Sequence, residues 1–218
     1  NPNHNLIEKC LKLAQILEYP ELDISKYIQK IHELGNSLKL KIGTGKNSTY
    51  LISMLNEYLF EECGFLGNEE DYYDPGNSFL NVVLDKKAGI PITLSIIYSE
   101  VAKYIGLDLR IVGFPGHVIV KYKDEIILDP FYHGRLLTIE DLEENLDRNF
   151  GEDVEFIPEY LNESTTEQLL ARLLRNLKNA YTQSYAYDKA IRCADMILEI
   201  QPESPEEIRD KGILEERL

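Results

Sequence analysis

The segment from Pro91 to Gly106 constrains the fold more than any other part of the sequence. Its apolar residues recur at helical spacing and leave almost no polar face for two turns. They are Leu94, Ile97, Tyr98, Val101, Ala102 and Ile105. Proline fits the first position of a helix, and a glycine commonly ends one. Because a helix that is apolar nearly all round must be buried, the sequence predicts a central helix surrounded by other elements.

The residues before this helix are expected to be mostly helical. Apolar residues recur at helical spacing in three segments, from Leu6 to Leu17, from Tyr27 to Leu34 and from Leu51 to Cys63. Tyr19-Pro20 and Gly43-Thr-Gly45 separate these segments. We therefore expect residues 1–63 to form a helical lead-in that packs on a core.

The pattern changes after the central helix. Short β-branched runs at Leu109–Val112, Val118–Tyr122 and Ile126–Leu128 predict strands, with Lys123–Glu125 as a hairpin turn. A weak capping box at Thr138 predicts a further helix. The expected fold class is α+β, with a core over residues 64–160 in which a central helix packs on a small antiparallel sheet.

The last part of the sequence, residues 161–218, is again helical in pattern. An offset of 34 residues overlays Ala171–Arg175 on Pro205–Arg209, which is the period of tetratricopeptide repeats. The sequence holds one such repeat and the start of another, whereas about three are needed for independent stability. We expect these helices to pack on the main domain, on residues outside the sequence or on another chain, and to contact a protein or peptide partner.

Composition narrows the possible partners. The 218 residues carry a formal net charge of −15, which argues against nucleic acid and against anionic lipid, since both need a basic surface. No apolar run approaches the length of a transmembrane helix, and no signal peptide is visible. Three widely spaced cysteines, Cys10, Cys63 and Cys193, fit free thiols in a reducing compartment. We expect a cytoplasmic protein with no nucleic-acid or membrane partner.

The negative charge is concentrated in one segment. From Glu140 to Glu163 there are ten acidic residues and one basic residue, Arg148. Such a run is typical of a solvated helix face and linker. It would also suit an acidic surface that docks a basic partner.

Two residues near the predicted hairpin could carry chemistry. His117 follows Gly113-Phe-Pro-Gly116 and lies early on one strand, and Asp129 lies at the end of the next strand. A hairpin turning near Asp124 places the two nearly opposite one another. The carboxylate could then hold one imidazole nitrogen and leave the other free as a base. We expect the start of the central helix to face this pair, where a thiol would have its pKa lowered.

Several motifs together resemble the transglutaminase-like superfamily. They are Gly89-Ile-Pro-Ile-Thr-Leu-Ser95, Gly106-Leu107, Val112-Gly-Phe-Pro-Gly-His117 and Leu128-Asp-Pro-Phe131, together with Asp71-Tyr-Tyr-Asp-Pro75, Asn77-Ser78 and Leu80-Asn81. The sequence most resembles a bacterial and archaeal subgroup of invasion-gene regulators (Sir-B-type) with appended tetratricopeptide helices, and related cores occur in some vertebrate F-box proteins. The resemblance covers roughly residues 50–218. It implies a papain-like core with a helix that carries the nucleophile, packed on a sheet that bears His117 and Asp129.

The sequence departs from this family at the nucleophile. Active members have Cys about fifteen residues before the glycine that ends the central helix, which here corresponds to Pro91, or to Thr93 with an error of two. Neither residue is Cys, and none of the three cysteines lies near this helix in the sequence. A Thr93 nucleophile would need a strong neighbouring base. The alternative is that its hydroxyl bonds the helix backbone.

Further candidate pocket residues lie in the loops on either side. Tyr72, Tyr73, Asp74, Asn77 and Asn81 precede the central helix, and His133 follows Asp129. The tyrosines and Asp74 could pack the loop over a pocket or contact a substrate. We expect no metal site, because the other histidines show no ligand spacing with His117, and no cofactor.

Three functions follow as hypotheses. The first is a non-catalytic binding, adaptor or regulatory protein whose core lacks the nucleophile. The second is an amide hydrolase or acyltransferase that uses Thr93 or water, with His117 as base and Asp129 to orient it. The third is a regulator of gene expression that acts through protein contacts rather than through DNA.

Overall fold

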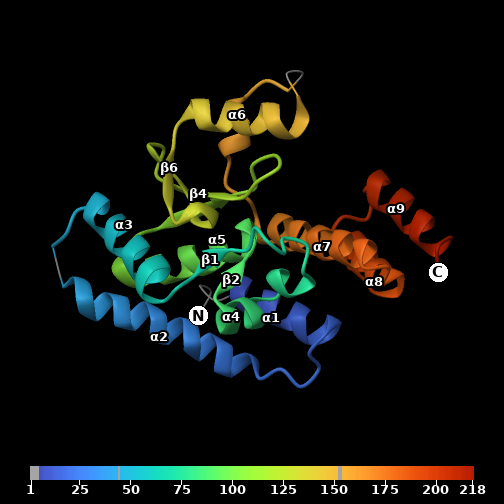
Figure 1. Cartoon of the computed structure of the whole chain (residues 1–218), viewed down its shortest axis with the longest axis horizontal. Coiled ribbons are helices and arrows are strands. Elements are labelled where there is room, and N and C mark those ends of the chain that lie inside the picture. The colour runs from blue at the N-terminus through green and yellow to red at the C-terminus, as the bar shows by residue number, and fades with distance from the viewer. Residues whose placement is uncertain (1–4, 44, 152–153) are drawn as a thin grey trace.

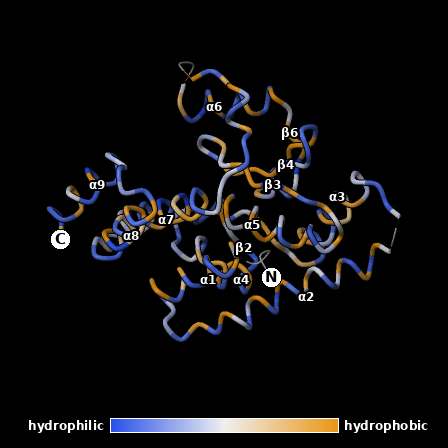
Figure 2. The backbone as a smooth tube through the Cα atoms, turned by 180° about the vertical axis from the view of Figure 1, so that it is seen from behind, coloured by the Kyte–Doolittle hydropathy of each residue, from blue (hydrophilic) through white to orange (hydrophobic). Residues whose placement is uncertain are grey.

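The computed structural model describes residues 5–43, 45–151 and 154–218 (Figure 1). At its centre lies helix α5 (Pro91–Ala102), whose 12 residues are all buried. A 3-10 turn, Lys103–Ile105, follows it and ends at Gly106, which has a φ of 80°. The predicted central helix is therefore confirmed, and the hydrophobic stretches of α5 and of the neighbouring strands gather in the middle of the molecule (Figure 2).

Three helices from the start of the chain contribute to the core around α5. They are α1 (Asn5–Leu17), α2 (Ile24–Ile42) and α3 (Ser48–Asn56), and a π-helical turn, Glu57–Glu62, continues α3. Apolar side chains of all three helices share one core with α5. Helix α2 crosses the end of α5 at Gly35, where the ring of Tyr104 fills the space that a Cβ atom would take.

A short segment leads from these helices into α5. It contains strand β1 (Leu66–Gly67), a 3-10 turn (Pro75–Ser78), helix α4 (Leu80–Lys86) and strand β2 (Ala88–Gly89). The two strands pair in parallel, with Gly67 opposite Gly89. This pairing ties the loop before α4 to the start of α5.

The main sheet is an antiparallel meander in chain order. Its strands are β3 (Leu109–Val112), β4 (Ile119–Tyr122), β5 (Ile126–Asp129) and β6 (Arg135–Leu137). The register pairs Val112 with Ile119 and Val120 with Leu128. The hairpin turn predicted at Lys123–Glu125 joins β4 to β5, which confirms that prediction and the α+β fold class.

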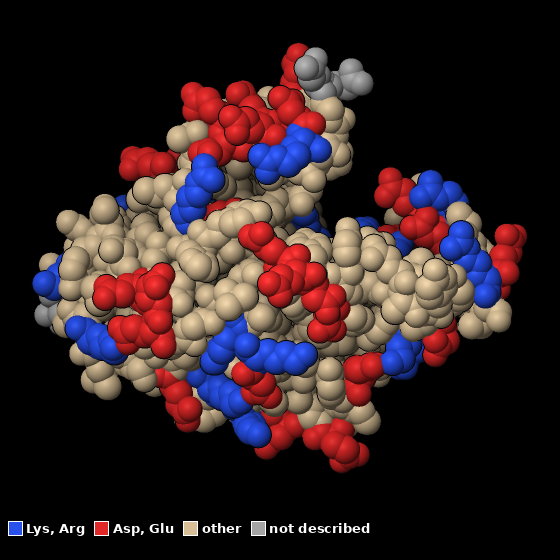
Figure 3. Space-filling model, in the orientation of Figure 1, with Lys and Arg blue, Asp and Glu red and all other residues tan. Residues whose placement is uncertain are grey.

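Both faces of the sheet are covered, because alternate residues of a strand point to opposite sides. Val120 and Leu128 belong to the core around α5, whereas Ile119 and Ile127 belong to a separate core with helix α6 (Ile139–Phe150). Helix α6 starts at the capping box predicted for Thr138. Acidic side chains gather at the top of the molecule in the region of α6 (Figure 3), while Glu152 and Asp153 of the acidic segment lie outside the described residues.

The chain returns to the N-terminal helices at its end. A 3-10 turn, Pro158–Leu161, leads to α7 (Thr166–Gln183), α8 (Tyr187–Ile200) and α9 (Pro205–Glu215). Residues of α7 and α8 form a core with Leu13, Ala14 and Leu17 of α1. The C-terminal helices therefore pack on the main domain, which is one of the three arrangements expected from the sequence.

Polar contacts strengthen this packing. Lys189 Nζ lies 2.6 Å from Glu18 Oε1, and Arg192 donates to the carbonyl of Ile16 at 2.9 Å.

The domain boundaries expected at residues 63 and 160 stay predictions. One hydrophobic core extends across both positions, from Ile7 to Leu173. Within the described ranges, every helix is too short or too polar to span a bilayer.

We predict opposite effects of alanine at two helical glycines. Gly35→Ala places a Cβ directly against the ring of Tyr104, so we expect a loss of about 1–3 kcal/mol through overpacking. Gly212→Ala in α9 meets nothing within 4 Å and should raise stability by up to about 1 kcal/mol through helix propensity. Urea unfolding of both variants measures the difference, and an equal gain for both would contradict the close approach at Gly35.

Candidate functional site

His117 and Asp129 are joined by a hydrogen bond. His117 Nε2 lies 2.8 Å from Asp129 Oδ2, and the other carboxylate oxygen accepts from the backbone N–H of Phe131 at 3.0 Å. Asp129 is only 3% exposed. Because an ionised carboxylate only accepts hydrogen bonds, the neutral imidazole carries its proton on Nε2. Nδ1 is then the nitrogen that could act as a base.

A tight turn sets the position of the imidazole. The N–H of His117 donates to the carbonyl of Phe114 at 3.1 Å, and Gly116 has a φ of 74°. Pro115 followed by this glycine is the sequence pattern of a type II turn, which needs a positive φ at its third residue. His117 therefore lies in a rigid turn directly before β4.

Aromatic rings surround the imidazole. Tyr132 stacks on it with ring centroids 6.4 Å apart, and Phe131 meets it edge-on at 6.1 Å. Tyr72 packs edge-on against Phe131 at 6.1 Å. Burial raises the pKa values of Tyr72 and Tyr132, so both hydroxyls stay neutral near pH 7.

The cavity beside the pair is small and lies under α6. Its volume is about 90 Å³. Among the described residues, its lining includes five from α6 and none from α5 (Asp141, Leu142, Glu144, Asn145 and Arg148). We expected the start of α5 to face the pair, whereas this cavity faces α6. The reason is that the pair lies at the ends of strands whose outward residues, Ile119 and Ile127, pack on α6.

The hydroxyl of Thr93 is used by the backbone. Thr93 is 0% exposed, and its Oγ1 donates to the carbonyl of Asn77 at 2.9 Å. The same atom accepts from the N–H of Ile90 at 3.1 Å. It thereby caps the first turn of α5 and ties it to the loop before α4. No hydrogen bond joins Thr93 to His117 within the part of the chain that the structure describes.

The loop candidates mainly organise the loop itself. The side-chain amide of Asn77 donates to the carbonyls of Asp71 and Tyr72 at 2.7 and 3.2 Å. Asp74 accepts from the N–H of Gly76 at 2.8 Å. Tyr73 packs edge-on against Tyr72. Only Tyr72 of this group extends toward the His117 pair, through Phe131.

Two candidates lie apart from the pair. His133 stacks on Phe60 with ring centroids 5.3 Å apart and does not line the cavity beside His117. Asn81 is buried beside a different cavity, which Tyr19 and Tyr27 also line, and its Oδ1 has no hydrogen-bond partner among the described residues. No group of three or more metal-binding side chains occurs among the residues at 5–43, 45–151 and 154–218.

Sequence reasoning did not find Arg172, which contacts the same turn from α7. Its guanidinium donates to the carbonyl of Phe114 at 2.8 Å. Helix α7 therefore holds the turn that carries His117. The only signal in the sequence is an arginine beside the apolar residues Leu169 and Leu173, and nothing local shows which carbonyl it reaches.

Comparison with family models gives the class of protein to which the chain belongs. Residues 25–175 match the family model described as the transglutaminase-like superfamily, and residues 177–218 match that of the tetratricopeptide repeat. The chain therefore belongs to the transglutaminase-like superfamily and ends in a tetratricopeptide repeat, a module that generally makes protein–protein contacts. Both resemblances that the sequence predicted are confirmed.

Relatives occur in bacteria and in vertebrates. A UPF0162 protein of Xylella fastidiosa is 36% identical over 202 residues, which cover 90% of this chain and 72% of the relative. A UPF0162 protein of Vibrio cholerae is 29% identical over 222 residues, 100% of this chain and 75% of the relative. Human F-box only protein 21 is 29% identical over 160 residues, 66% of this chain but 25% of that protein. No solved structure matches the chain significantly.

We predict that Thr93 acts on stability through its hydroxyl. Thr93→Val keeps the shape but leaves the N–H of Ile90 and the carbonyl of Asn77 without their partner, so we expect a loss of roughly 1–3 kcal/mol. Thr93→Ser keeps the hydroxyl and should lose only about 1 kcal/mol with the methyl group. Denaturant unfolding compares the two, and a Val variant as stable as the native protein would rule out the capping role.

We also predict that two thiols resist alkylation. Burial raises the pKa of Cys10 and of Cys193 to about 12, so almost no thiolate forms at pH 8. Iodoacetamide should modify only Cys63 in the native protein, and all three cysteines after unfolding. Peptide mass spectrometry assigns the sites. Rapid native labelling of Cys10 or Cys193 would contradict the burial of these thiols.

Proposed function

We propose that this protein is a binding module that holds a protein or peptide partner and that its core does not carry out thiol chemistry. The start of α5 carries the proposal. Pro91 and Ile92 offer no nucleophile there, and the Thr93 hydroxyl is engaged by two backbone groups. Because a hydroxyl nucleophile needs a base within hydrogen-bond reach, this arrangement favours a structural role for Thr93.

The cysteines support the same reading. A thiol acts as a nucleophile only as thiolate, and the raised pKa values of Cys10 and Cys193 keep these two protonated near neutral pH. Cys63 ends the π-helical turn and does not line the cavity beside His117. None of the three thiols lines the cavity beside His117, where the imidazole could accept its proton.

The size of the cavity beside His117 also favours binding elsewhere. At about 90 Å³ it is far below the roughly 300–1,000 Å³ of ordinary ligand pockets. Helix α6 and the ring of Tyr132 close around the imidazole. A cavity of this size leaves little room for an amide substrate beside the imidazole.

The C-terminal helices supply the binding part of the proposal. Helices α7 and α8 form an antiparallel pair whose inner side packs on α1 and on α9. Pairs of this kind hold peptides on their outer grooves. In this proposal the His117 pair fixes the β4–β5 hairpin, and the repeat recruits the partner.

One observation keeps an enzyme as a second candidate. The hydrogen bond between His117 and Asp129 is intact, so Nδ1 could take a proton from water while the water oxygen attacks an amide carbon. The imidazolium would then return that proton to the leaving amine. This reaction needs neither Thr93 nor a thiol.

We predict no turnover by the native protein. The full chain and its His117→Ala variant are incubated with a fluorescent amine and dimethylcasein, for crosslinking, and with a peptide mixture, for hydrolysis. We expect both proteins to match the buffer blank in gel fluorescence and in mass spectra. Turnover by the native chain that His117→Ala abolishes would overturn the proposal in favour of the second candidate.

A binding arm tests the positive part of the proposal. Peptides selected from a random library on the full chain are mapped by hydrogen exchange. We expect protection on α7 to α9 and unchanged affinity for His117→Ala. Protection confined to the cavity under α6 would contradict the assignment of binding to the repeat.

A further inference from the structure

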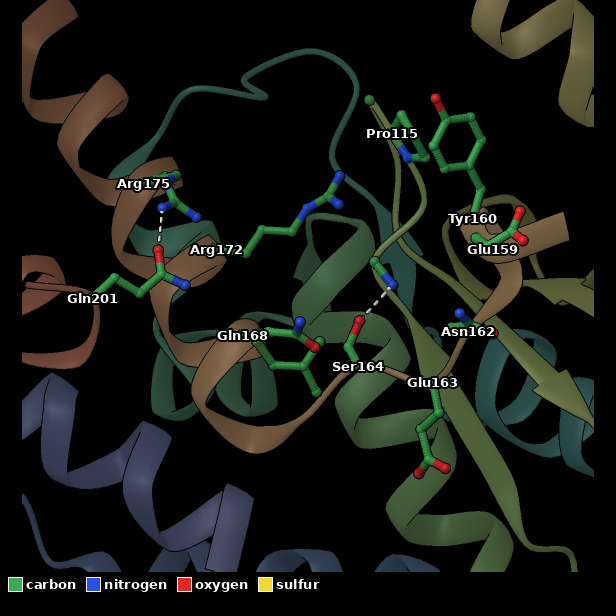
Figure 4. A pocket seen from close by; sticks show the side chains of 13 residues that line it. Pro115, Glu159, Tyr160, Asn162, Glu163, Ser164, Gln168, Arg172, Arg175 and Gln201 are labelled. Atoms are coloured by element: carbon green, nitrogen blue, oxygen red, sulfur yellow. Dashed lines mark hydrogen bonds between the residues drawn. The ribbon is translucent and has the colours of Figure 1, made fainter. Parts of the chain in front are cut away.

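A larger pocket lies where the core meets the repeat helices (Figure 4). Its volume is about 610 Å³, within the range of ordinary ligand sites. The wall comes from the turn after β3, from residues 159–164, from α7 and from Gln201 at the end of α8. The pocket is distinct from the small cavity beside His117, although the same turn borders both.

Arg172 extends into this pocket as a cation without a counter-charge. Its guanidinium uses one N–H to bond the carbonyl of Phe114. Within the described part of the chain, no carboxylate forms an ion pair with it. A guanidinium has five N–H donors, so most of the fork is available to a ligand. Burial lowers the pKa of Arg172, as expected for a desolvated cation, but the group stays charged near neutral pH.

The neighbouring cations of α7 differ in this respect. Arg175 Nε lies 2.8 Å from Glu207 Oε1, and Lys178 Nζ lies 2.6 Å from Glu207 Oε2. Lys178 also lies 2.7 Å from Asp210 Oδ2. Asp210 also pairs with Arg209 at 2.8 Å, so Arg175 and Lys178 have carboxylate partners along this side of α7. Arg172 has no equivalent partner, so its charge is directed at the pocket.

Other polar groups of the pocket can donate hydrogen bonds. Ser164 Oγ accepts from the N–H of Gly113 at 2.9 Å, which leaves its own hydrogen to donate. Gln168 Oε1 accepts from the N–H of Thr165 at 2.8 Å, which leaves its NH₂ group. Figure 4 shows both side chains beside Arg172. A set of donors around a cation suits an anionic acceptor.

The acidic residues of the wall leave this donor set open. Glu163 points away from Arg172 in Figure 4 and lies 3.9 Å from Arg110. Glu159 lies beside Tyr160 on the opposite side of the pocket. Neither carboxylate fills the position in front of the guanidinium.

We propose that this pocket binds a carboxylate group carried by a partner peptide and that Arg172 anchors it. A guanidinium fork matches a planar carboxylate in two parallel hydrogen bonds. Arg172 is a single unneutralised cation, which matches the single negative charge of a carboxylate. A phosphate group carries a charge of about −1.5 to −2. The net charge of −15 on the chain disfavours binding of this larger negative charge. The inference rests on the proposed binding function and gives the chemistry of the partner.

Titration of the full chain with short peptides tests the ligand class. The probes are acetyl-tetraalanine with a free C-terminal carboxylate, the same peptide amidated, and an amidated acetyl-pentapeptide of alanine with a central glutamate. We expect the amidated alanine peptide to bind at least tenfold more weakly than one acid-bearing probe in calorimetry. The acid-bearing probe that binds more tightly identifies the source as a chain terminus or a side chain. Equal affinity for all three would overturn the inference.

Variants test the anchor. Arg172→Gln should weaken binding of the better acid probe by roughly 10- to 100-fold. Gln168→Glu should do the same by adding a negative charge to the pocket, while it keeps the capping box and the Arg172–Phe114 bond. Arg192→Gln is the matched control, since Arg192 also donates to a backbone carbonyl but lies outside the pocket. Unchanged affinity in both pocket variants would overturn the assignment of Arg172.

Two further readouts separate the possible failures. A probe with phosphoserine in place of glutamate that binds more tightly than both acids would overturn the carboxylate class. Mass spectra of the peptides after titration report cleavage. Intact peptides that do not bind would refute this inference alone, whereas cleaved peptides would refute the proposed non-catalytic function.

Discussion

The complete burial of α5 is the constraint on which the rest of the structure depends. A helix without a face in water needs apolar neighbours on every side. Here the N-terminal helices, the sheet and Leu169 and Leu173 of α7 all contribute to the core around it. The same burial decides what the start of the helix can do. The hydroxyl of Thr93 has no access to water, and it bonds the backbone instead.

The turn from Phe114 to His117 lies between two of the cavities in the structure. The carbonyl of Phe114 accepts from both the N–H of His117 and the guanidinium of Arg172. On one side of the turn lies the cavity under α6, and on the other lies the pocket bordered by α7. Because one peptide group borders both cavities, Arg172 of α7 helps to hold the turn that carries the imidazole.

Local patterns in the sequence predicted a large part of this fold. The buried helix, the hairpin turn at Lys123–Glu125 and the capping box at Thr138 each depend on residues a few positions apart. The pairing of His117 with Asp129 followed from the hairpin. The position of α6 over that pair, the reach of Arg172 to Phe114 and the stacking of His133 on Phe60 could not be predicted. Each of these joins separate elements, and no local spacing records which surfaces meet.

The contacts of α1 have a consequence for synthesis of the chain. Lys189 meets Glu18 across 171 residues, and the apolar side of α1 is covered by α7 and α8. At about 5–20 residues per second, a ribosome needs roughly 10 to 30 s to make that stretch. During this time Leu13, Ala14 and Leu17 have no C-terminal cover. Of the described helices, α1 therefore leaves the ribosome early and is among the last to complete its packing, so the nascent chain exposes an apolar surface that the finished protein hides.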